Sequence, residues 1–151
     1  MNEYFDIALN LASDRFLGDR EKVITNAISH NVNYFNIVCS SIDELDFVKD
    51  LNNRFRENSC FTLGVHPHNA NELNEENLQS LRNSINMHHP SAVGETGLDF
   101  FRNLSSFENQ LNAFEQQIII SIENNLPLFL HQREAHDDFI EVIDKYISDI
   151  P

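Results

Sequence analysis

The sequence lacks several features that would fix its class directly. It has only two cysteines, Cys39 and Cys60, too few for the disulfide framework of a small secreted domain. It has no apolar stretch long enough to cross a bilayer, and its first residues lack the basic and long apolar regions of a signal peptide. We therefore expect a cytoplasmic protein that does not enter a membrane, with both cysteines acting as small buried hydrophobes.

Basic residues are also scarce. The 151-residue chain carries 10 Lys and Arg against 24 Asp and Glu, which gives a formal net charge of −14. A protein that grips duplex nucleic acid along its backbone usually has a basic face, so this balance argues against extended nucleic-acid binding. It leaves open a nuclease that holds a few nucleotides through a bound cation and one or two arginines, because a divalent metal is the largest local charge in its site.

Motifs of nucleophilic catalysis and of nucleotide binding are missing as well. The chain contains no nucleophile elbow, and no glycine-rich phosphate loop follows an apolar run. It also contains no linker and no low-complexity tract. A length of 151 residues is ordinary for one domain with a sizeable core, so we expect residues 1–151 to belong to a single domain.

What the chain does have is five short apolar runs that alternate with segments of helical period. The runs are continuous and partly β-branched or aromatic, as expected for strands buried on both faces. They are Phe5–Leu9, Tyr34–Cys39, Cys60–Val65, Ala92–Gly94 and Pro127–Leu130. The helical stripes are Val23–Ile28, Ile42–Phe55, Leu78–Ile85, Phe107–Ile122 and Phe139–Ile147. This alternation predicts an α/β fold built from parallel βα units.

The number of units leaves two architectures open. Five βα units are too few to close an eight-stranded barrel, which needs about 250 residues. We therefore expect either an open five-stranded sheet or the first part of a barrel. Both leave apolar strands at unpaired edges, which favour aggregation.

Before the fourth helix, Ser105–Glu108 has the spacing of a capping box.

Two residues with metal-binding chemistry end the last two runs. Glu95 follows the run at Ala92–Gly94, and His131 follows Pro127–Leu130. Catalytic groups of parallel barrels lie at the C-terminal ends of the strands, so we expect both side chains to converge on one divalent cation. Glu95 can also serve as a general base. The plainer alternatives are a solvated loop glutamate and a structural histidine.

Further candidates have less specific signals. Arg133 offers a planar charged fork to a phosphate, or it is a surface arginine at a helix entry. His66 follows the third run directly and is a candidate substrate contact, whereas His68 can equally be solvated. Asp99 is either a first-turn residue of the next segment or an acceptor that orients another ligand. Asn10 ends the first run and is only a weak metal ligand.

In their order along the chain, these motifs resemble those of the TatD family of metal-dependent deoxyribonucleases. The matching segments are Phe5–Leu11, Gly64–His68, Gly94–Arg102, Gln110-Leu111 and Pro127–Ala135. The resemblance implies a (β/α)8 TIM-barrel-type metal-dependent hydrolase, of which this chain covers about five βα units. It also implies exonucleolytic hydrolysis of DNA phosphodiester bonds, with short or single-stranded ends as substrate. It makes Glu95 and His131 the catalytic metal ligands and puts His66 and Arg133 near the phosphate.

The cation implied by the resemblance is Mg²⁺, with Mn²⁺ and Zn²⁺ as alternatives. This chain departs from the family's pattern in two places. Most family members carry a His-x-His pair where this chain has Ala8 and Asn10, and the family's later ligands would fall beyond Pro151. Two other functions therefore stay open. One is a non-catalytic barrel fragment that needs a partner chain, and the other is an amide or ester hydrolase on the same barrel, which the acidic charge favours.

Overall fold

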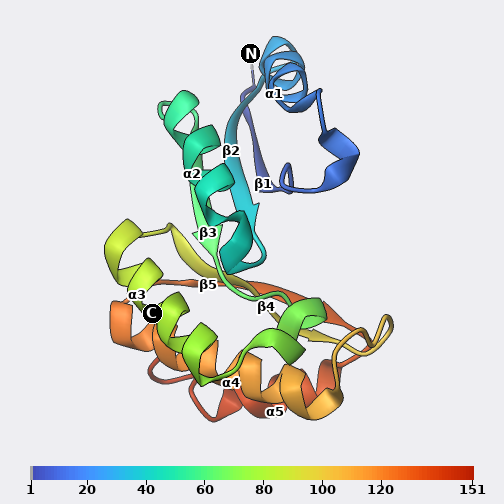
Figure 1. Cartoon of the computed structure of the whole chain (residues 1–151), viewed down its shortest axis with the longest axis vertical. Helices are drawn as coiled ribbons and strands as arrows, with labels where there is room; N and C mark the ends of the chain where they lie inside the picture. The colour runs from blue at the N-terminus through green and yellow to red at the C-terminus, as the bar shows by residue number, and fades with distance from the viewer. Residues whose placement is uncertain (1) are drawn as a thin grey trace.

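The computed structural model describes residues 2–151, in which five parallel strands alternate with five α-helices (Figure 1). The strands form one sheet in the order β1-β2-β3-β4-β5. They are β1 (Tyr4–Leu9), β2 (Val32–Cys39), β3 (Ser59–Leu63), β4 (Ala92–Asp99) and β5 (Leu128–Arg133). The helices are α1 (Arg20–Ser29), α2 (Leu45–Arg54), α3 (Glu75–His88), α4 (Phe107–Asn124) and α5 (His136–Asp144). The predicted alternation of strand and helix is confirmed.

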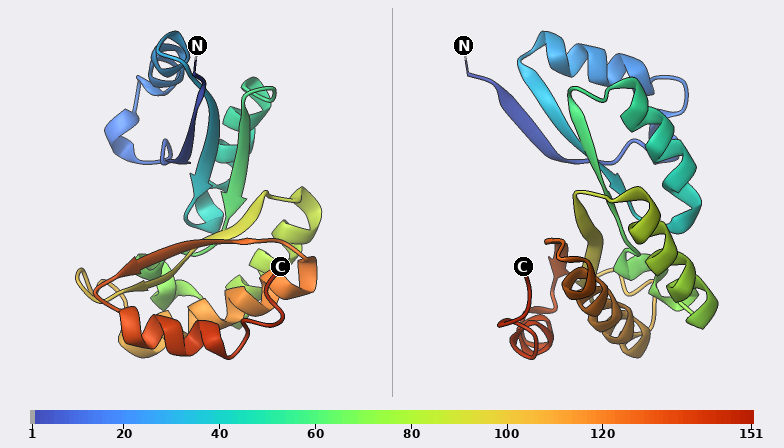
Figure 2. Two further views of the ribbon diagram at one scale, coloured as in Figure 1. Left: turned by 180° about the vertical axis from the view of Figure 1, so that it is seen from behind. Right: turned by 90° about the vertical axis from the view of Figure 1, so that its left-hand side faces the viewer.

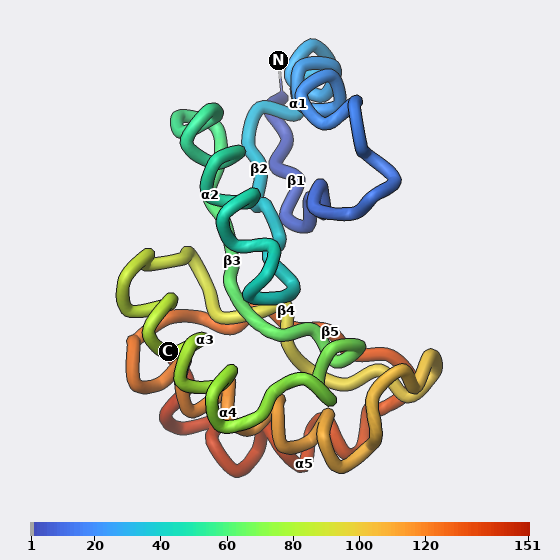
Figure 3. The backbone as a smooth tube through the Cα atoms, viewed as in Figure 1, coloured from blue at the N-terminus to red at the C-terminus, as the bar shows by residue number. Residues whose placement is uncertain are grey.

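The sheet curls into an open half-barrel, and the helices lie along its outer side (Figure 2). The chain path in Figure 3 shows β1 and β2 at one end of this sheet and β4 with β5 at the other. Each of the outer strands, β1 and β5, has one sheet neighbour. The prediction that the strands are buried on both faces is wrong for both outer strands. Tyr4, Phe5 and Ile7 of β1 are more than half exposed, and no residue of β5 is fully buried.

Two strand ends differ from the apolar pattern. The predicted run Ala92–Gly94 is only the start of β4, which continues to Asp99. Glu95 therefore lies inside a strand instead of following it, and His131 likewise lies inside β5. The reason is that β4 and β5 stay paired as far as Asp99 and Arg133, with an irregularity at Glu95. A bulge of this kind re-aims a side chain without ending the ladder.

The core has two parts. The larger part lies between the sheet and helices α1 to α3 and includes Phe35, Ile37 and Cys39. Burial raises the pKa of the Cys39 thiol to about 12, so this cysteine is protonated and behaves as a small hydrophobe, as predicted. The smaller part joins β4 and β5 to α4 and α5 through Leu98 and Phe114.

Within residues 2–151, no helix is long and apolar enough to span a membrane.

The start of α4 differs from the predicted capping box. Ser106 is the N-cap, and its hydroxyl accepts the backbone N–H of Asn109 at 3.3 Å. Ser105 instead is buried, and its hydroxyl donates to the backbone oxygen of His68 at 2.8 Å. The predicted pair Ser105–Glu108 is therefore wrong. The serine that looked like a cap ties the start of α4 to the loop after β3.

Candidate metal centre

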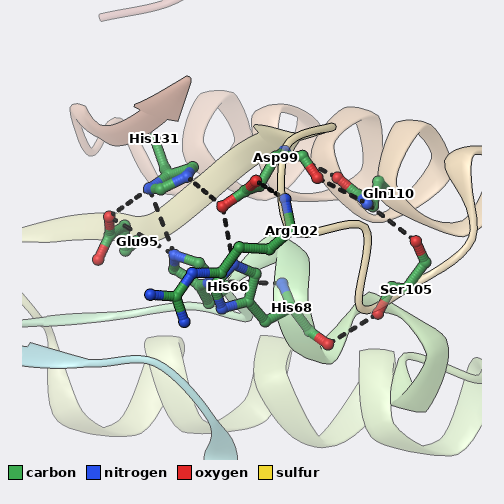
Figure 4. Close-up of polar contacts among 8 residues, drawn as sticks. All are labelled: His66, His68, Glu95, Asp99, Arg102, Ser105, Gln110 and His131. Carbon is green, nitrogen blue, oxygen red and sulfur yellow. Dashed lines mark hydrogen bonds and ion pairs between the residues drawn. The ribbon is translucent and has the colours of Figure 1, made fainter. Parts of the chain in front are cut away.

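Side chains from β4, from β5 and from the loop after β3 meet at one point of the curled sheet (Figure 4). Glu95 Oε1 lies 3.0 Å from His131 Nδ1 and 3.7 Å from His66 Nε2. The two imidazole nitrogens are 3.3 Å apart. One ligand atom from each residue lies within 4.8 Å of the other two, which is the spacing of donors that share a cation. The structure thus brings the predicted pair together and adds His66.

The close approach of β4 and β5 depends on a glycine. Gly97 is the partner of His131 across the two strands and has a φ of +142°. A Cβ atom at Gly97 would lie 1.9 Å from the backbone oxygen of His131. Residues other than glycine also rarely adopt this φ. The glycine two residues after Glu95 therefore allows β5 to hold His131 against the carboxylate.

Asp99 holds the other side of the His131 ring. Its side chain is 1% exposed, and its Oδ2 lies 3.2 Å from His131 Nε2 and 2.8 Å from His68 Nε2. Its Oδ1 accepts the backbone N–H of Arg102 at 2.8 Å. With Nε2 directed at Asp99, the Nδ1 atom of His131 faces Glu95. A carboxylate behind a histidine is a common way to orient a metal ligand.

The electrostatics of the three candidate ligands suit a cation. Burial lowers the pKa of His66 to about 4, so its imidazole is neutral near pH 7. Burial alone would raise the pKa of Glu95, but the hydrogen bond with His131 and the nearby imidazoles lower it. The same hydrogen bond raises the pKa of His131. One carboxylate and two imidazoles form a donor set that divalent transition metals bind readily.

The pKa of the Asp99 carboxyl lies below its usual range. Burial of its carboxyl would raise its pKa, but the hydrogen bonds from Arg102, His68 and His131 outweigh this effect and lower the pKa to about 2. Asp99 therefore stays ionised at any pH at which the protein is expected to work. Because its charge faces both His68 and His131, it stabilises the donor arrangement around them.

Two buried glutamines of α4, Gln110 and Gln117, hold the backbone beside these side chains, a role that the sequence alone did not indicate. Gln117 accepts the N–H of Val65 at 2.7 Å and donates to its carbonyl at 3.0 Å. Gln110 accepts the N–H of Asp99 at 2.8 Å and donates to the carbonyl of Ser105 at 2.9 Å. Val65 precedes His66 directly, so each amide fixes a backbone segment that carries a site residue. Their spacing of seven residues, two helical turns, was the available signal.

The remaining candidates surround the same open cavity. Arg133 lines it, and its guanidinium carbon lies 3.9 Å above the centre of the Phe101 ring. Asn10 also lines it but does not belong to the cluster of three ligands. His68, which the sequence left as either a contact or a solvated residue, is hydrogen-bonded to the carboxylate of Asp99. The lining side chains are Asn10, Ser13, Ser40, Glu44, His66, His68, Asn69, Glu95, Asp99, Arg102, His131 and Arg133.

Comparison with protein families gives one match over nearly the whole chain. The model of the TatD related DNase family matches residues 5–149. The chain belongs to the TatD family. The 3′-5′ ssDNA/RNA exonuclease TatD of Pantoea ananatis is 38% identical over 147 residues, which are 97% of this chain and 56% of that relative. The chain thus spans about half the length of the curated relatives that it matches.

Solved structures confirm the fold class. An uncharacterized amidohydrolase from Saccharomyces cerevisiae superposes with a TM-score of 0.87 at 28% identity, covering 97% of this chain and 52% of that one. A TatD family hydrolase from Entamoeba histolytica gives a TM-score of 0.86 at 25% identity, covering 97% and 55%. The five βα units are therefore a half-barrel of the TIM-barrel type, as the TatD resemblance implied, and TatD family hydrolases are metal-dependent.

Proposed function

We propose that this protein is a metal-dependent nuclease that removes nucleotides from the 3′ end of single-stranded DNA. The observation that carries the proposal is the convergence of His66, Glu95 and His131, whose ligand atoms lie within 4.8 Å of one another. Three protein ligands are the usual number in a catalytic metal site that keeps a position open. The direction and the single-stranded substrate come from the name of the Pantoea ananatis relative.

The donor set bears on which cation is held. Carboxylate oxygens suit Mg²⁺ and Mn²⁺, whereas imidazole nitrogens suit transition metals such as Zn²⁺. With two imidazoles and one carboxylate, we propose Mn²⁺ or Zn²⁺ ahead of the Mg²⁺ that the resemblance alone implied. When bound, such a cation lowers the pKa of a coordinated water and neutralises charge on the phosphoryl oxygens.

The chain's own groups have separate tasks in this proposal. Asp99 keeps the His131 ring turned so that Nδ1 faces the cavity. Glu95 supplies the negative charge of the ligand set. It can also act as a general base that accepts a proton from a water molecule. Arg102 and Arg133, which line the same cavity, provide positive charge for a phosphate in a chain whose net charge is −14.

The test is the shortening of a 5′-labelled single-stranded oligonucleotide, followed on a denaturing gel with Mn²⁺ and again with EDTA. We expect a ladder of products that shorten from the 3′ end with Mn²⁺ and none with EDTA. Glu95→Gln removes a ligand charge and should lower the rate about ten- to a hundredfold. Glu108→Gln, which changes an exposed acid in the first turn of α4, is the matched control. A Glu95→Gln rate equal to that of the wild type would contradict the proposal.

A second candidate is a half-barrel that acts only when a partner chain covers its open edges. It is favoured by the exposed side chains of β1, of which Ile7 is 59% exposed. Saturable Mn²⁺ binding without any cleavage would support this candidate over the first. Hydrolysis of p-nitrophenyl acetate without cleavage of the oligonucleotide would instead support the amide or ester alternative.

A further inference from the structure

The loop between β4 and α4 and the first residue of α4 expose large apolar side chains beside the cavity. Phe101 is 54% exposed, Leu104 60% and Phe107 48%. The Phe107 ring is held against Phe100, with the two centroids 4.8 Å apart. An exposed apolar patch next to a polar cavity indicates a surface that contacts something flat or apolar. The proposed hydrolysis of the phosphodiester bond does not itself use these side chains.

Phe101 is not isolated, because Arg133 covers one of its faces. The guanidinium carbon lies 3.9 Å from the ring centroid. Asp99 and Arg133 are partners across the two strands, and the N–H of Phe100 donates to the carbonyl of Arg133 at 3.0 Å. The backbones that carry the ring and the guanidinium are therefore held together by strand pairing. The guanidinium lies over the ring, and more than half of Phe101 stays exposed.

The pair lies next to the candidate ligands along both strands. Arg133 is two residues after His131, and Phe101 is two residues after Asp99. Arg133 and Arg102 line the same cavity as the three candidate ligands. A phosphate held among these groups would therefore have its attached nucleoside within reach of the stacked pair.

We propose that Phe101 and Arg133 form a stacking site for an unpaired nucleobase of the strand held at the metal centre. This proposal rests on the proposed function and names the part of the substrate that the site recognises. Bases stack on aromatic rings and on arginine planes, and this stacking tolerates every base because each has a flat face. A base inside a duplex has both faces covered by its neighbours. Such a pair favours an unpaired base at a single-stranded end over a base inside a duplex.

The test uses 2-aminopurine, a fluorescent base that is quenched when it stacks. The chain contains no tryptophan, so protein emission does not obscure the signal. A five-nucleotide single-stranded DNA carries the probe in turn at each of the three positions nearest its 3′ end. Phosphorothioate linkages slow cleavage, so that Mn²⁺ can be present. We expect the wild-type chain to quench one of these positions more strongly than the other two.

Three variants make the test specific. Phe101→Leu keeps an apolar side chain without a flat ring and should lose the quenching, with a dissociation constant raised roughly 5- to 150-fold. Phe101→Tyr keeps the ring and should retain both. Phe5→Leu is the matched control, because Phe5 is 52% exposed but lies on β1, and it should behave like the wild type.

Two results would overturn the stacking site. One is wild-type quenching by Phe101→Leu, and the other is a wild-type chain that quenches no position or quenches a blunt duplex equally well. Neither depends on cleavage. If the chain quenches the probe but cuts no oligonucleotide, the stacking site stands and the proposed nuclease function fails. If it cuts oligonucleotides without quenching, the nuclease function stands and the stacking site fails.

Discussion

Strands β4 and β1 belong to one sheet but are held very differently. Every residue of β4 except Glu95 is buried, and the strand has β3 and β5 as neighbours and α4 packed against it. In β1 only Asp6 and Leu9 are even partly buried, and the strand pairs with β2 alone across two breaks in register. Glu95 and Asp99 thus lie on the strand whose position is fixed from several sides, whereas His131 lies on the outer strand β5.

The same contrast applies to individual side chains. Asp99 of β4 is bonded through its carboxylate and through its backbone, the latter by Gln110. Asn10, directly after β1, is exposed and only lines the cavity. A ligand can be held precisely only where its own backbone and rotamer are restrained. Glu95, on the restrained strand, belongs to the cluster of three candidate ligands, whereas Asn10, which the sequence made only a weak ligand, does not.

The largest expected change in stability comes from removing the hydrogen bonds by which α4 restrains β4. Gln110→Leu keeps the size of the side chain but leaves the buried N–H of Asp99 and the carbonyl of Ser105 without partners. Unpaired buried groups of this kind destabilise a protein by about 2 to 4 kcal/mol in total. Urea denaturation should show this loss in the free energy of unfolding.

The control for this variant is Gln79→Leu. Gln79 is exposed on α3 and bonds to Asn83, so the same replacement there should change the free energy of unfolding by less than about 0.5 kcal/mol. Equal effects at Gln110 and Gln79 would mean that α4 does not restrain β4 through this side chain.

A smaller effect is expected from pH. The pKa of Asp99 is about 2 in the folded protein and about 3.9 in an unfolded chain. Because the folded value is the lower one, its stabilisation is present above about pH 4 and is lost as the pH falls toward 2. The total is about 2.5 kcal/mol, of which about 1 kcal/mol is lost between pH 5 and pH 3.

Asp99→Asn isolates this contribution, because the amide does not titrate. The free energy of unfolding of the variant should fall less between pH 5 and pH 3 than that of the wild type, by about 1 kcal/mol. Parallel pH curves for the two proteins would show that Asp99 does not carry the assigned interactions.

The smallest effect on stability is expected at β1. Ile7 is 59% exposed, so Ile7→Lys should change the free energy of unfolding by less than about 0.5 kcal/mol. A lysine on an edge strand opposes pairing with another chain, so concentration-dependent light scattering should decrease. Thr25→Lys, on the exposed side of α1, adds the same charge elsewhere and should leave the scattering unchanged. A large loss of stability in Ile7→Lys would remove the contrast between β1 and β4.

Much of the fold could be predicted because its signal is local. Five apolar runs gave the five strands, and the stripe that begins at Phe107 gave α4. The extension of β4 from Gly94 to Asp99 could not be predicted in this way, since it depends on pairing with β5. The same holds for the exposure of β1, which follows from its place at the edge of the sheet and not from its own residues.

The candidate site was predictable to a similar degree. Glu95 and His131 could be found because each follows an apolar run, and parallel strands end at one edge of a sheet. The proposed role of His66 as a third donor and the hydrogen bond between His68 and Asp99 depend on the path of the loop after β3. Sequence spacing alone does not determine such a path, so these contacts required the structure.

The central claim is that His66, Glu95 and His131 hold one divalent cation, and titration with Mn²⁺ followed by electron paramagnetic resonance tests it most directly. The wild-type chain should bind one Mn²⁺ with saturation, Glu108→Gln should bind it equally well, and Glu95→Gln should bind it at least about tenfold more weakly. No saturable binding by the wild type, or equal binding by Glu95→Gln, would contradict the account.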